Sequence, residues 1–345
     1  MVMNAPPISV GVIGLGRMGR RHVEVVQSLG MKIVGLVDIN ADAIAETIEQ
    51  FGLVDASGFS DAIQMLDSLE MDALVVATTA PYHHEAVIAA AGRGIKRILC
   101  EKPIAVSVEQ AREMIAACSR SDTQLAINHQ MRFMAQYTRV RELIDTPALG
   151  GLASIVVSAS NFGLAMNAGH YFEMFRYMTG SEVNSVNAWF EPQKLANPRG
   201  AQFEDASGRV LARNADSQAM YIDLSANAGW GLCVNYICRN GQISVDELSG
   251  EMVVKAREEE YRELPTTRYG MPVITQRHMI PPADSVAPTR AVWEAMLSGQ
   301  SFPDGNDGLH SLKCLVASHL SNERGGAEVA LDAVECENKR VFSWA

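Results

Sequence analysis

The stretch Ile8-Ser9-Val10-Gly11-Val12-Ile13-Gly14-Leu15-Gly16-Arg17-Met18-Gly19 decides how the N-terminal part of the chain folds. A run of mainly apolar residues ends in three glycines spaced Gly-x-Gly-x-x-Gly, and helical periodicity without a proline continues to Gln27. The pattern predicts a strand, a tight turn and a helix. Glycine suits all three sites, because Gly14 can adopt positive φ, Gly16 lets backbone amides approach a pyrophosphate, and Gly19 allows close helix–strand packing. The phosphates would lie at the positive end of the helix dipole.

A carboxylate follows this turn at the spacing of a dinucleotide site. The predicted second strand, Lys32–Val37, ends in Asp38, nineteen residues after Gly19, where the carboxylate can accept hydrogen bonds from the adenosine ribose hydroxyls. It would also repel a 2′-phosphate, and the next positions, Ile39 and Asn40, hold no arginine. The residues therefore favour NAD over NADP. The alternative is an ordinary glycine turn followed by a surface aspartate.

The bulk properties describe a soluble globular protein of two domains. The chain has 345 residues, more than one hydrophobic core usually supports, with 48% apolar and 20% charged residues. Its net charge of -11 argues against nucleic acid or an anionic membrane as the main partner. We expect a cytoplasmic protein without a metal site, because no apolar run could span a membrane, residues 1–7 do not resemble a secretory signal, and the six cysteines are scattered.

Strands and helices alternate through the first part of the chain, as in a doubly wound parallel sheet. We therefore predict an N-terminal Rossmann domain over residues 1–128. Asp72–Thr78 has the continuous apolar character of a strand buried on both faces. A later strand, Lys96–Cys100, delivers Glu101-Lys102-Pro103 at its carboxyl end, where such sheets bind their ligands. A capping box, Ser107–Gln110, opens the next helix.

The pattern changes after Gly150-Gly151, where segments of alternating polarity follow one another. With the helical stretch Gly169–Met178, they predict an α+β domain over residues 129–345, built on a mostly antiparallel open sheet. Asn240-Gly241 is a hairpin signal, and helical patterns return at Thr289–Leu297 and Gly308–Leu320. The expected strands are Leu152–Ser160, Glu182–Phe190, Gln218–Leu224, Trp230–Ile237, Gln242–Leu248 and Glu251–Ala256.

Motifs spread over nearly the whole chain resemble the pattern of one enzyme family. They are the glycine turn with Asp38, Glu101-Lys102-Pro103, Asn128–Phe133, Gly169-His170 followed by Gly180, and the tail Asp304–Leu312. The pattern is similar to that of the Gfo/Idh/MocA family, which includes glucose-fructose oxidoreductase and inositol dehydrogenase. The resemblance implies a two-domain oxidoreductase that acts on a secondary alcohol of a sugar, inositol or nucleotide sugar, or runs the reverse. Similar proteins are usually dimers or tetramers joined through the sheet.

The resemblance also implies roles for individual residues. Lys102 and His170 would be the catalytic pair, and Arg132, Asn167 and Tyr171 would lie near the substrate. A base that takes a hydroxyl proton needs a pKa near neutrality, which a lysine reaches only if burial and the oxidised nicotinamide depress its pKa from about 10. An imidazole already has a pKa of about 6.5. The expected cofactor contacts are Gly14, Gly16, Arg17, Met18, Gly19, Asp38, Asn40, Thr78, Thr79, Pro81, His84, Glu101 and Lys102.

Structural roles compete with several of these assignments. A lysine before proline at a strand end is often a solvated surface charge, which is the alternative for Lys102. His84 could be a packed histidine that bonds a carbonyl, and His170 could cap the helix that it begins. Glu173, three residues after His170, could orient the imidazole or pair with Arg176.

One position departs from the family pattern. Family members commonly place an aspartate four residues before the histidine, where this sequence has Met166 followed by Asn167. Asparagine donates and accepts hydrogen bonds but cannot take a proton. Either the substrate differs from the common polyols, or the role of base falls on Lys102 and His170. Arg132 has a structural alternative, in which it bonds carbonyls at the domain junction.

Three functions are compatible with these observations. The first is an NAD-dependent dehydrogenase, and the second is glycoside cleavage in which bound NAD transiently oxidises a sugar hydroxyl. The third is a catalytically silent sensor that binds a dinucleotide and a protein partner. Retention of Lys102 and His170 weighs against the sensor, whereas loss of the aspartate weighs for it.

Overall fold

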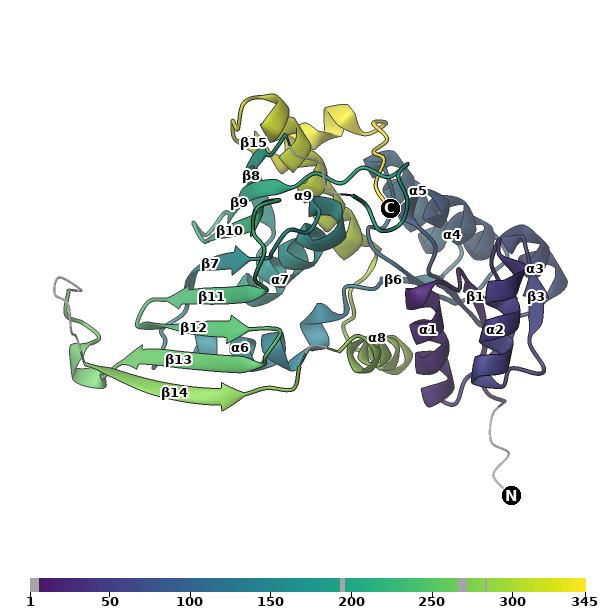
Figure 1. Ribbon diagram of the computed structural model, residues 1–345, viewed down its shortest axis with the longest axis horizontal. Coiled ribbons are helices and arrows are strands. Elements are labelled where there is room, and N and C mark those ends of the chain that lie inside the picture. The colour runs from purple at the N-terminus through teal and green to yellow at the C-terminus, as the bar shows by residue number, and fades with distance from the viewer. Residues whose placement is uncertain (1–5, 193–195, 266–271, 283) are drawn as a thin grey trace, which may run out of the picture. The chain divides into compact units, whose positions relative to one another are not determined.

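The computed structural model describes residues 6–192, 196–265, 272–282 and 284–345. The chain forms two compact units, drawn in Figure 1. The first contains the chain up to residue 130 together with residues 285–312 and 338–345, and the second contains residues 131–284 and 313–337. Segments 285–312 and 338–345, which the sequence-based division gives to the second domain, therefore belong to the first unit.

The first unit is built on a six-stranded parallel sheet, which confirms the Rossmann prediction. Its strand order is β3-β2-β1-β4-β5-β6, so the chain runs from β1 to β3 at one edge and then returns to place β4 on the other side of β1. The side chains of β4 are fully buried, as the continuous apolar sequence predicts for a central strand. The strands are β1 (Ser9–Ile13), β2 (Lys32–Val37), β3 (Ser57–Phe59), β4 (Ala73–Val76), β5 (Arg97–Cys100) and β6 (Gln124–Ile127).

Local sequence signals set the ends of the helices that cover this sheet. Asn40 accepts a hydrogen bond from the Asp42 amide at the start of α2, and Ser107 accepts one from the Gln110 amide at the start of α5. Gly52 ends α2 at a φ of +65°. The helices are α1 (Arg17–Ser28), α2 (Ala41–Phe51), α3 (Ala62–Ser68), α4 (His83–Gly92), α5 (Val108–Arg120), α8 (Val286–Ser298) and the first part of α9 (Gly305–Glu323).

The second unit is a nine-stranded sheet with α6 (Ala135–Ile144) and α7 (Gly169–Thr179). Its order is β14-β13-β12-β11-β7-β10-β9-β8-β15, and among the described pairs only β7 and β10 run parallel. Burial alternates along the strands, so one face is buried and the other is open, as predicted. The strands are β7 (Leu152–Ser158), β8 (Val183–Phe190), β9 (Gly208–Asn214), β10 (Ala219–Leu224), β11 (Cys233–Cys238), β12 (Gly241–Asp246), β13 (Glu251–Arg257), β14 (Val273–Met279) and β15 (Val329–Ala330).

The expected strands and helices of this unit appear within a few residues of their predicted bounds, and β11 and β12 form the predicted hairpin at Asn240-Gly241. Strands β9, β14 and β15 and helix α6 were not predicted. Strand β14 lies at the edge of the sheet and is largely exposed, so its sequence lacks an apolar face. In β9 one of the buried positions is the small Ala212, so the apolar alternation that would indicate a strand is weak. Among the described helices, none has the length and apolar character needed to cross a bilayer.

A carboxyl group is buried in the core of the second unit. Glu247, directly after β12, is 6% exposed and accepts a short hydrogen bond from the Tyr137 hydroxyl of α6. Tyr171 of α7 and Tyr236 of β11 are buried near it. Burial raises the pKa of Glu247 to about 7, although the hydrogen bond from Tyr137 acts in the opposite direction.

Stability of the second unit should therefore depend on Glu247. Its folded pKa lies above its ordinary value of 4.5, so the stabilisation from the neutral acid is complete below pH 4.5 and is lost as pH rises through about 7. We expect Glu247→Gln to raise the free energy of unfolding by about 3 kcal/mol at pH 8 and to leave it unchanged at pH 4. Thermal unfolding at both pH values measures this. Exposed Glu263→Gln is the control, and equal effects at both pH values would contradict the expectation.

Candidate active site

The glycine turn lies at the carboxyl end of β1 and is tied to its neighbours. Gly14 has a φ of +88°, and its amide donates to the Val37 carbonyl at 2.8 Å. A Cβ on Gly14 would lie 2.7 Å from the Ala77 oxygen, and one on Gly19 would lie 1.8 Å from the Gly14 oxygen. At Gly16, no described atom lies within 4 Å of the Cβ position. The predicted structural roles of Gly14 and Gly19 are confirmed, whereas the approach of a phosphate to the open space at Gly16 stays a prediction.

Asp38 stands directly beside this turn. Its Oδ2 accepts a hydrogen bond from the Leu15 amide at 2.8 Å, and its Oδ1 accepts one from the Asn40 amide at 2.9 Å. Each carboxylate oxygen can accept a further hydrogen bond, so the group can hold the turn and still bind a hydroxyl.

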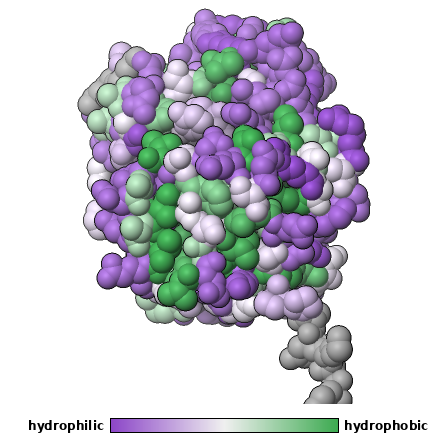
Figure 2. Space-filling view, turned by 90° about the vertical axis from the view of Figure 1, so that its right-hand side faces the viewer, coloured by the Kyte–Doolittle hydropathy of each residue, from purple (hydrophilic) through white to green (hydrophobic). Residues whose placement is uncertain are grey.

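Two hollows lie on the first unit, whose α2–α3 side faces the viewer in Figure 2, and Asp38 lines one of them. Ile39, which is 95% exposed, is among the residues that line one of them. This set of residues fits an adenosine, with an apolar surface for the base and a carboxylate for the ribose. The first hollow, about 420 Å³, is lined by Leu15, Gly16, Arg17, Arg20 and Gln50, and the second, about 350 Å³, by Asp38, Ile39, Ala41, Ile44, Ala45, Ile48, Gly58, Phe59 and Ser60.

Glu101, at the carboxyl end of β5, is a buried carboxylate held from three directions. Nε2 of His22 in α1 lies 2.9 Å from its Oε1, and the Asn128 side chain, just after β6, donates to the same oxygen at 2.8 Å. The Lys102 amide donates to Oε2 at 3.3 Å. Burial alone would raise the pKa of Glu101, but His22, Asn128 and the charge of Lys102 outweigh burial and hold this pKa well below its usual value. The carboxylate is therefore ionised.

His83 connects the ends of β4 and β5. Its Nε2 lies 3.1 Å from the Thr78 carbonyl and its Nδ1 lies 3.0 Å from the carbonyl of Pro103, which follows Lys102 through a cis peptide bond. The ring is completely buried, and burial lowers the pKa of His83 against the opposing effect of the two carbonyls. The imidazole thus connects the segment after β4 to the segment after β5 that carries Lys102.

The neighbouring residue His84 has a different partner from His83. Its Nε2 lies 2.6 Å from Oε2 of Glu113 in α5, and about a quarter of its side chain is exposed. The alternative in which His84 bonds a nearby carbonyl is therefore wrong. Its partner is the Glu113 carboxylate, and the carbonyls of Thr78 and Pro103 are bonded by His83. The role of His84 as a cofactor contact stays a prediction. Pro81 lies in the short helical turn Ala80–Tyr82 before α4, where the sequence predicts a first-turn proline.

His170 lies near the start of α7 in the second unit. The helical run begins one turn earlier, with the π-helical turn Leu164–Ala168. Within residues 164–171, only Met166, Asn167 and His170 are partly exposed, and they share one helical face. Tyr171 is 2% exposed and lies in the core near Glu247. Because Lys102 belongs to the first unit and His170 to the second, their meeting at one substrate stays a prediction.

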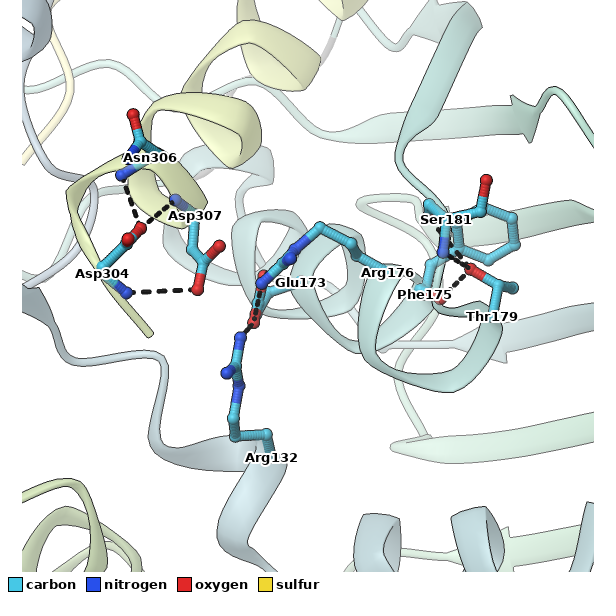
Figure 3. A network of polar contacts seen from close by, with 9 residues as sticks. All are labelled: Arg132, Glu173, Phe175, Arg176, Thr179, Ser181, Asp304, Asn306 and Asp307. Carbon is cyan, nitrogen blue, oxygen red and sulfur yellow. Dashed lines mark hydrogen bonds and ion pairs between the residues drawn. The ribbon is translucent and has the colours of Figure 1, made fainter. Parts of the chain in front are cut away.

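The carboxylate of Glu173 is 2% exposed and is bound by two arginines (Figure 3). Arg132 donates to Oε1 through a short contact, and Nε of Arg176 donates to Oε2 at 3.0 Å. The alternative in which Glu173 pairs with Arg176 is confirmed. Arg132 is fixed by the same carboxylate, and its contact with substrate stays a prediction, as do those of Asn167 and Tyr171.

Sequence reasoning missed His22, His83 and the Asn128 side chain as parts of the Glu101–Lys102 surroundings. His22 follows Gly19 by three residues, so it shares the buried face of α1 with that glycine and with Val26. A histidine within an otherwise apolar helix face was the available signal, since such a group needs a polar partner in the core.

Comparisons with known proteins agree with this geometry. Residues 8–129 match the family model GFO_IDH_MocA, described as an oxidoreductase family with an NAD-binding Rossmann fold. The myo-inositol 2-dehydrogenase of Thermotoga maritima is 27% identical over 269 residues, which are 72% of this chain and 78% of that protein.

Two solved structures share the fold. An oxidoreductase from Agrobacterium radiobacter, in complex with NAD+, L-tartaric acid and magnesium, superposes with a TM-score of 0.80 at 17% identity, covering 95% of this chain and 100% of the other. The transcriptional regulator Gal80p from Kluyveromyces lactis gives 0.77 at 18% identity, covering 97% and 94%. At these identities the likeness shows the fold alone, and both an enzyme and a regulator carry it.

Two histidine–glutamate pairs allow a test of the buried network. We expect His22→Ala to lower the free energy of unfolding by about 2–4 kcal/mol, because it leaves the Glu101 charge buried with one partner fewer. His84→Ala breaks a shorter but exposed contact with Glu113 and should change the free energy of unfolding by less than about 0.5 kcal/mol. Urea unfolding at pH 7 measures both variants. Equal losses would show that burial does not decide the strength of these pairs.

Proposed function

Because residues 8–129 match the model of the Gfo/Idh/MocA oxidoreductase family, we propose that this protein is an NAD-dependent dehydrogenase. It transfers a hydride between nicotinamide and a secondary alcohol or ketone of a sugar, an inositol or a nucleotide sugar. The observation that carries the proposal is the position of Lys102. This lysine follows the buried, ionised Glu101 at the edge of the sheet formed by the carboxyl ends of the strands, which also carries the glycine turn.

The first unit supplies groups suited to NAD. The pyrophosphate would bind at the turn beside Gly16, where the amides of Arg17 and Met18 begin α1. Asp38 would accept hydrogen bonds from the ribose hydroxyls, and the hollow at Ile39 would receive the adenine. The proposed preference for NAD over NADP rests on the charge of Asp38, which would repel a 2′-phosphate. Bound nicotinamide supplies the chemistry of accepting or giving the hydride.

The proton must be handled by the chain itself. Glu101 is a poor candidate for the base, because its carboxylate is ionised at a pKa well below the usual range and already accepts three hydrogen bonds. It instead fixes the backbone from which Lys102 extends. Lys102 Nζ and the His170 imidazole are the two groups proposed to hold the substrate hydroxyl and take its proton. Their convergence on one small molecule is part of the proposal.

We also propose that the protein is a homodimer or homotetramer. The open face of the nine-stranded sheet exposes Val156 of β7 and Trp189 of β8 on the same side. Apolar and aromatic side chains on an open sheet face suit contact with a second copy of the chain.

Screening for reduction of NAD+ tests the proposed function directly. A panel of sugars, inositols and nucleotide sugars is incubated with the protein and NAD+, and the absorbance of reduced nicotinamide is followed. Turnover of at least one member is the expected result. Binding of NAD without turnover of any member would favour the silent sensor, and cleavage of a glycoside without net reduction would favour transient oxidation.

Lys102→Met should lower kcat by about 10²–10⁴-fold, because it removes the group proposed to handle the hydroxyl proton. NAD affinity should stay within about twofold of the parent value, since the glycine turn and Asp38 are untouched. The control is Lys96→Met, which removes an exposed lysine at the opposite, amino end of β5. Unchanged turnover in Lys102→Met would remove its assigned role.

Asp38→Ala should weaken NAD far more than NADP. The substitution removes an acceptor for the ribose hydroxyls but also relieves repulsion of a 2′-phosphate, so the two effects partly cancel for NADP only. Fluorescence titration with both reduced cofactors measures the change. Asp42→Ala, an acidic residue in the first turn of α2, controls for charge alone. Equal losses for NAD and NADP would show that the ribose contact is misplaced.

A further inference from the structure

The helix that carries His170 is capped by a loop forty residues further along the chain. The first three amides of the helical run have no partner within it. Leu164 N donates to the Ala206 carbonyl at 2.8 Å, Ala165 N to Oδ1 of Asp205 at 2.7 Å, and Met166 N to Oδ2 of Asp205 at 2.9 Å. A single carboxylate therefore bridges two successive amides.

Gly163 shows how closely the carboxylate approaches. A Cβ at this position would lie 2.0 Å from Oδ2 of Asp205 and 2.1 Å from its Cγ. The φ of Gly163 is −73°, which any residue adopts, so the glycine is required for space and not for its backbone conformation. Residues 163 and 205 thus fit each other as a pair.

Helix geometry directs the His170 side chain toward the turn held in this way. Side chains of a helix tilt toward its N-terminus, so the imidazole is directed toward residues 166 and 167, about 6 Å back along the axis. Met166 is four residues before His170, and it is bonded to Asp205. Any shift of this first turn would therefore move the face that presents Asn167 and His170.

We propose that Asp205 is a positioning residue, which fixes the first helical turn so that His170 and Asn167 face the substrate. The inference rests on the proposed function for the role of His170. The helix itself has no carboxylate at position 166, which is Met166. The carboxylate in this region comes instead from Asp205, which lies outside the helix. The contacts of Asp205 that carry this role are to the backbone, one amide to each carboxylate oxygen.

Two substitutions disturb the same contact from opposite sides. Asp205→Ala removes the carboxylate, and Gly163→Ala pushes it away; each should lower kcat about ten- to a hundredfold while the NAD dissociation constant stays within about twofold. The double variant should be no worse than the poorer single one, because both act on one contact. Asp205→Asn keeps one acceptor oxygen, so its kcat should lie between those of the parent protein and of Asp205→Ala. This variant preserves the test if the alanine variant fails to fold. Controls are Asp216→Asn, an exposed carboxylate, and Gly229→Ala, where a Cβ meets no described atom within 4 Å.

A second readout needs no substrate. In protein labelled with ¹³C-histidine, the ring resonance of His170, assigned by its loss in His170→Gln, should shift in Asp205→Asn and Gly163→Ala and stay in place in the controls. Unmoved His170 resonances in folded variants, or additive losses of kcat, would overturn the inference. If no sugar or inositol is turned over but the ring resonance shifts, the proposed function fails while the positioning contact stands.

Discussion

The ionised carboxylate of Glu101 is the point on which the first unit depends. A buried charge is costly unless hydrogen bonds surround it, so His22, Asn128 and the Lys102 amide must all be in place. These partners come from α1, from the end of β6 and from the segment after β5. Asn128 in turn contacts Thr289 of α8 at 3.4 Å. One carboxylate thus connects the helix of the glycine turn to the strand end that carries Lys102.

Much of the fold could be predicted because its signals are local. Glycines at a tight turn, a serine or asparagine before a helix, and apolar runs in central strands each act within a few residues. Strand β14 is different, since it is exposed at a sheet edge and its sequence, Val273–Met279, has no reason to alternate. The return of α8 to the first unit depends on contacts with α1 that no short window of sequence contains.

The same distinction applies to the candidate site. Asp38 and Lys102 could be proposed as site residues because each lies at the carboxyl end of a recognisable strand. His83 and His84 could not be separated, because α4 is apolar around most of its circumference and adjacent residues differ by about 100° of rotation. The contact of Asp205 with the first turn before α7 joins residues forty positions apart, and neither Gly163 nor Asp205 carries a pattern that indicates the other.

The discontinuous first unit has a consequence for how the protein is made. Helix α8 lies against α1, where Arg21 donates to the Ser285 hydroxyl at 2.5 Å, and the Phe342 amide donates to the Val106 carbonyl at 3.0 Å. A ribosome must therefore synthesise all of residues 131–284 after the sixth strand before α8 can cover α1, roughly ten to thirty seconds at usual elongation rates. During that interval α1 lacks the helix that lies against it in the complete fold. The first unit can therefore be completed only after most of the second unit has been synthesised.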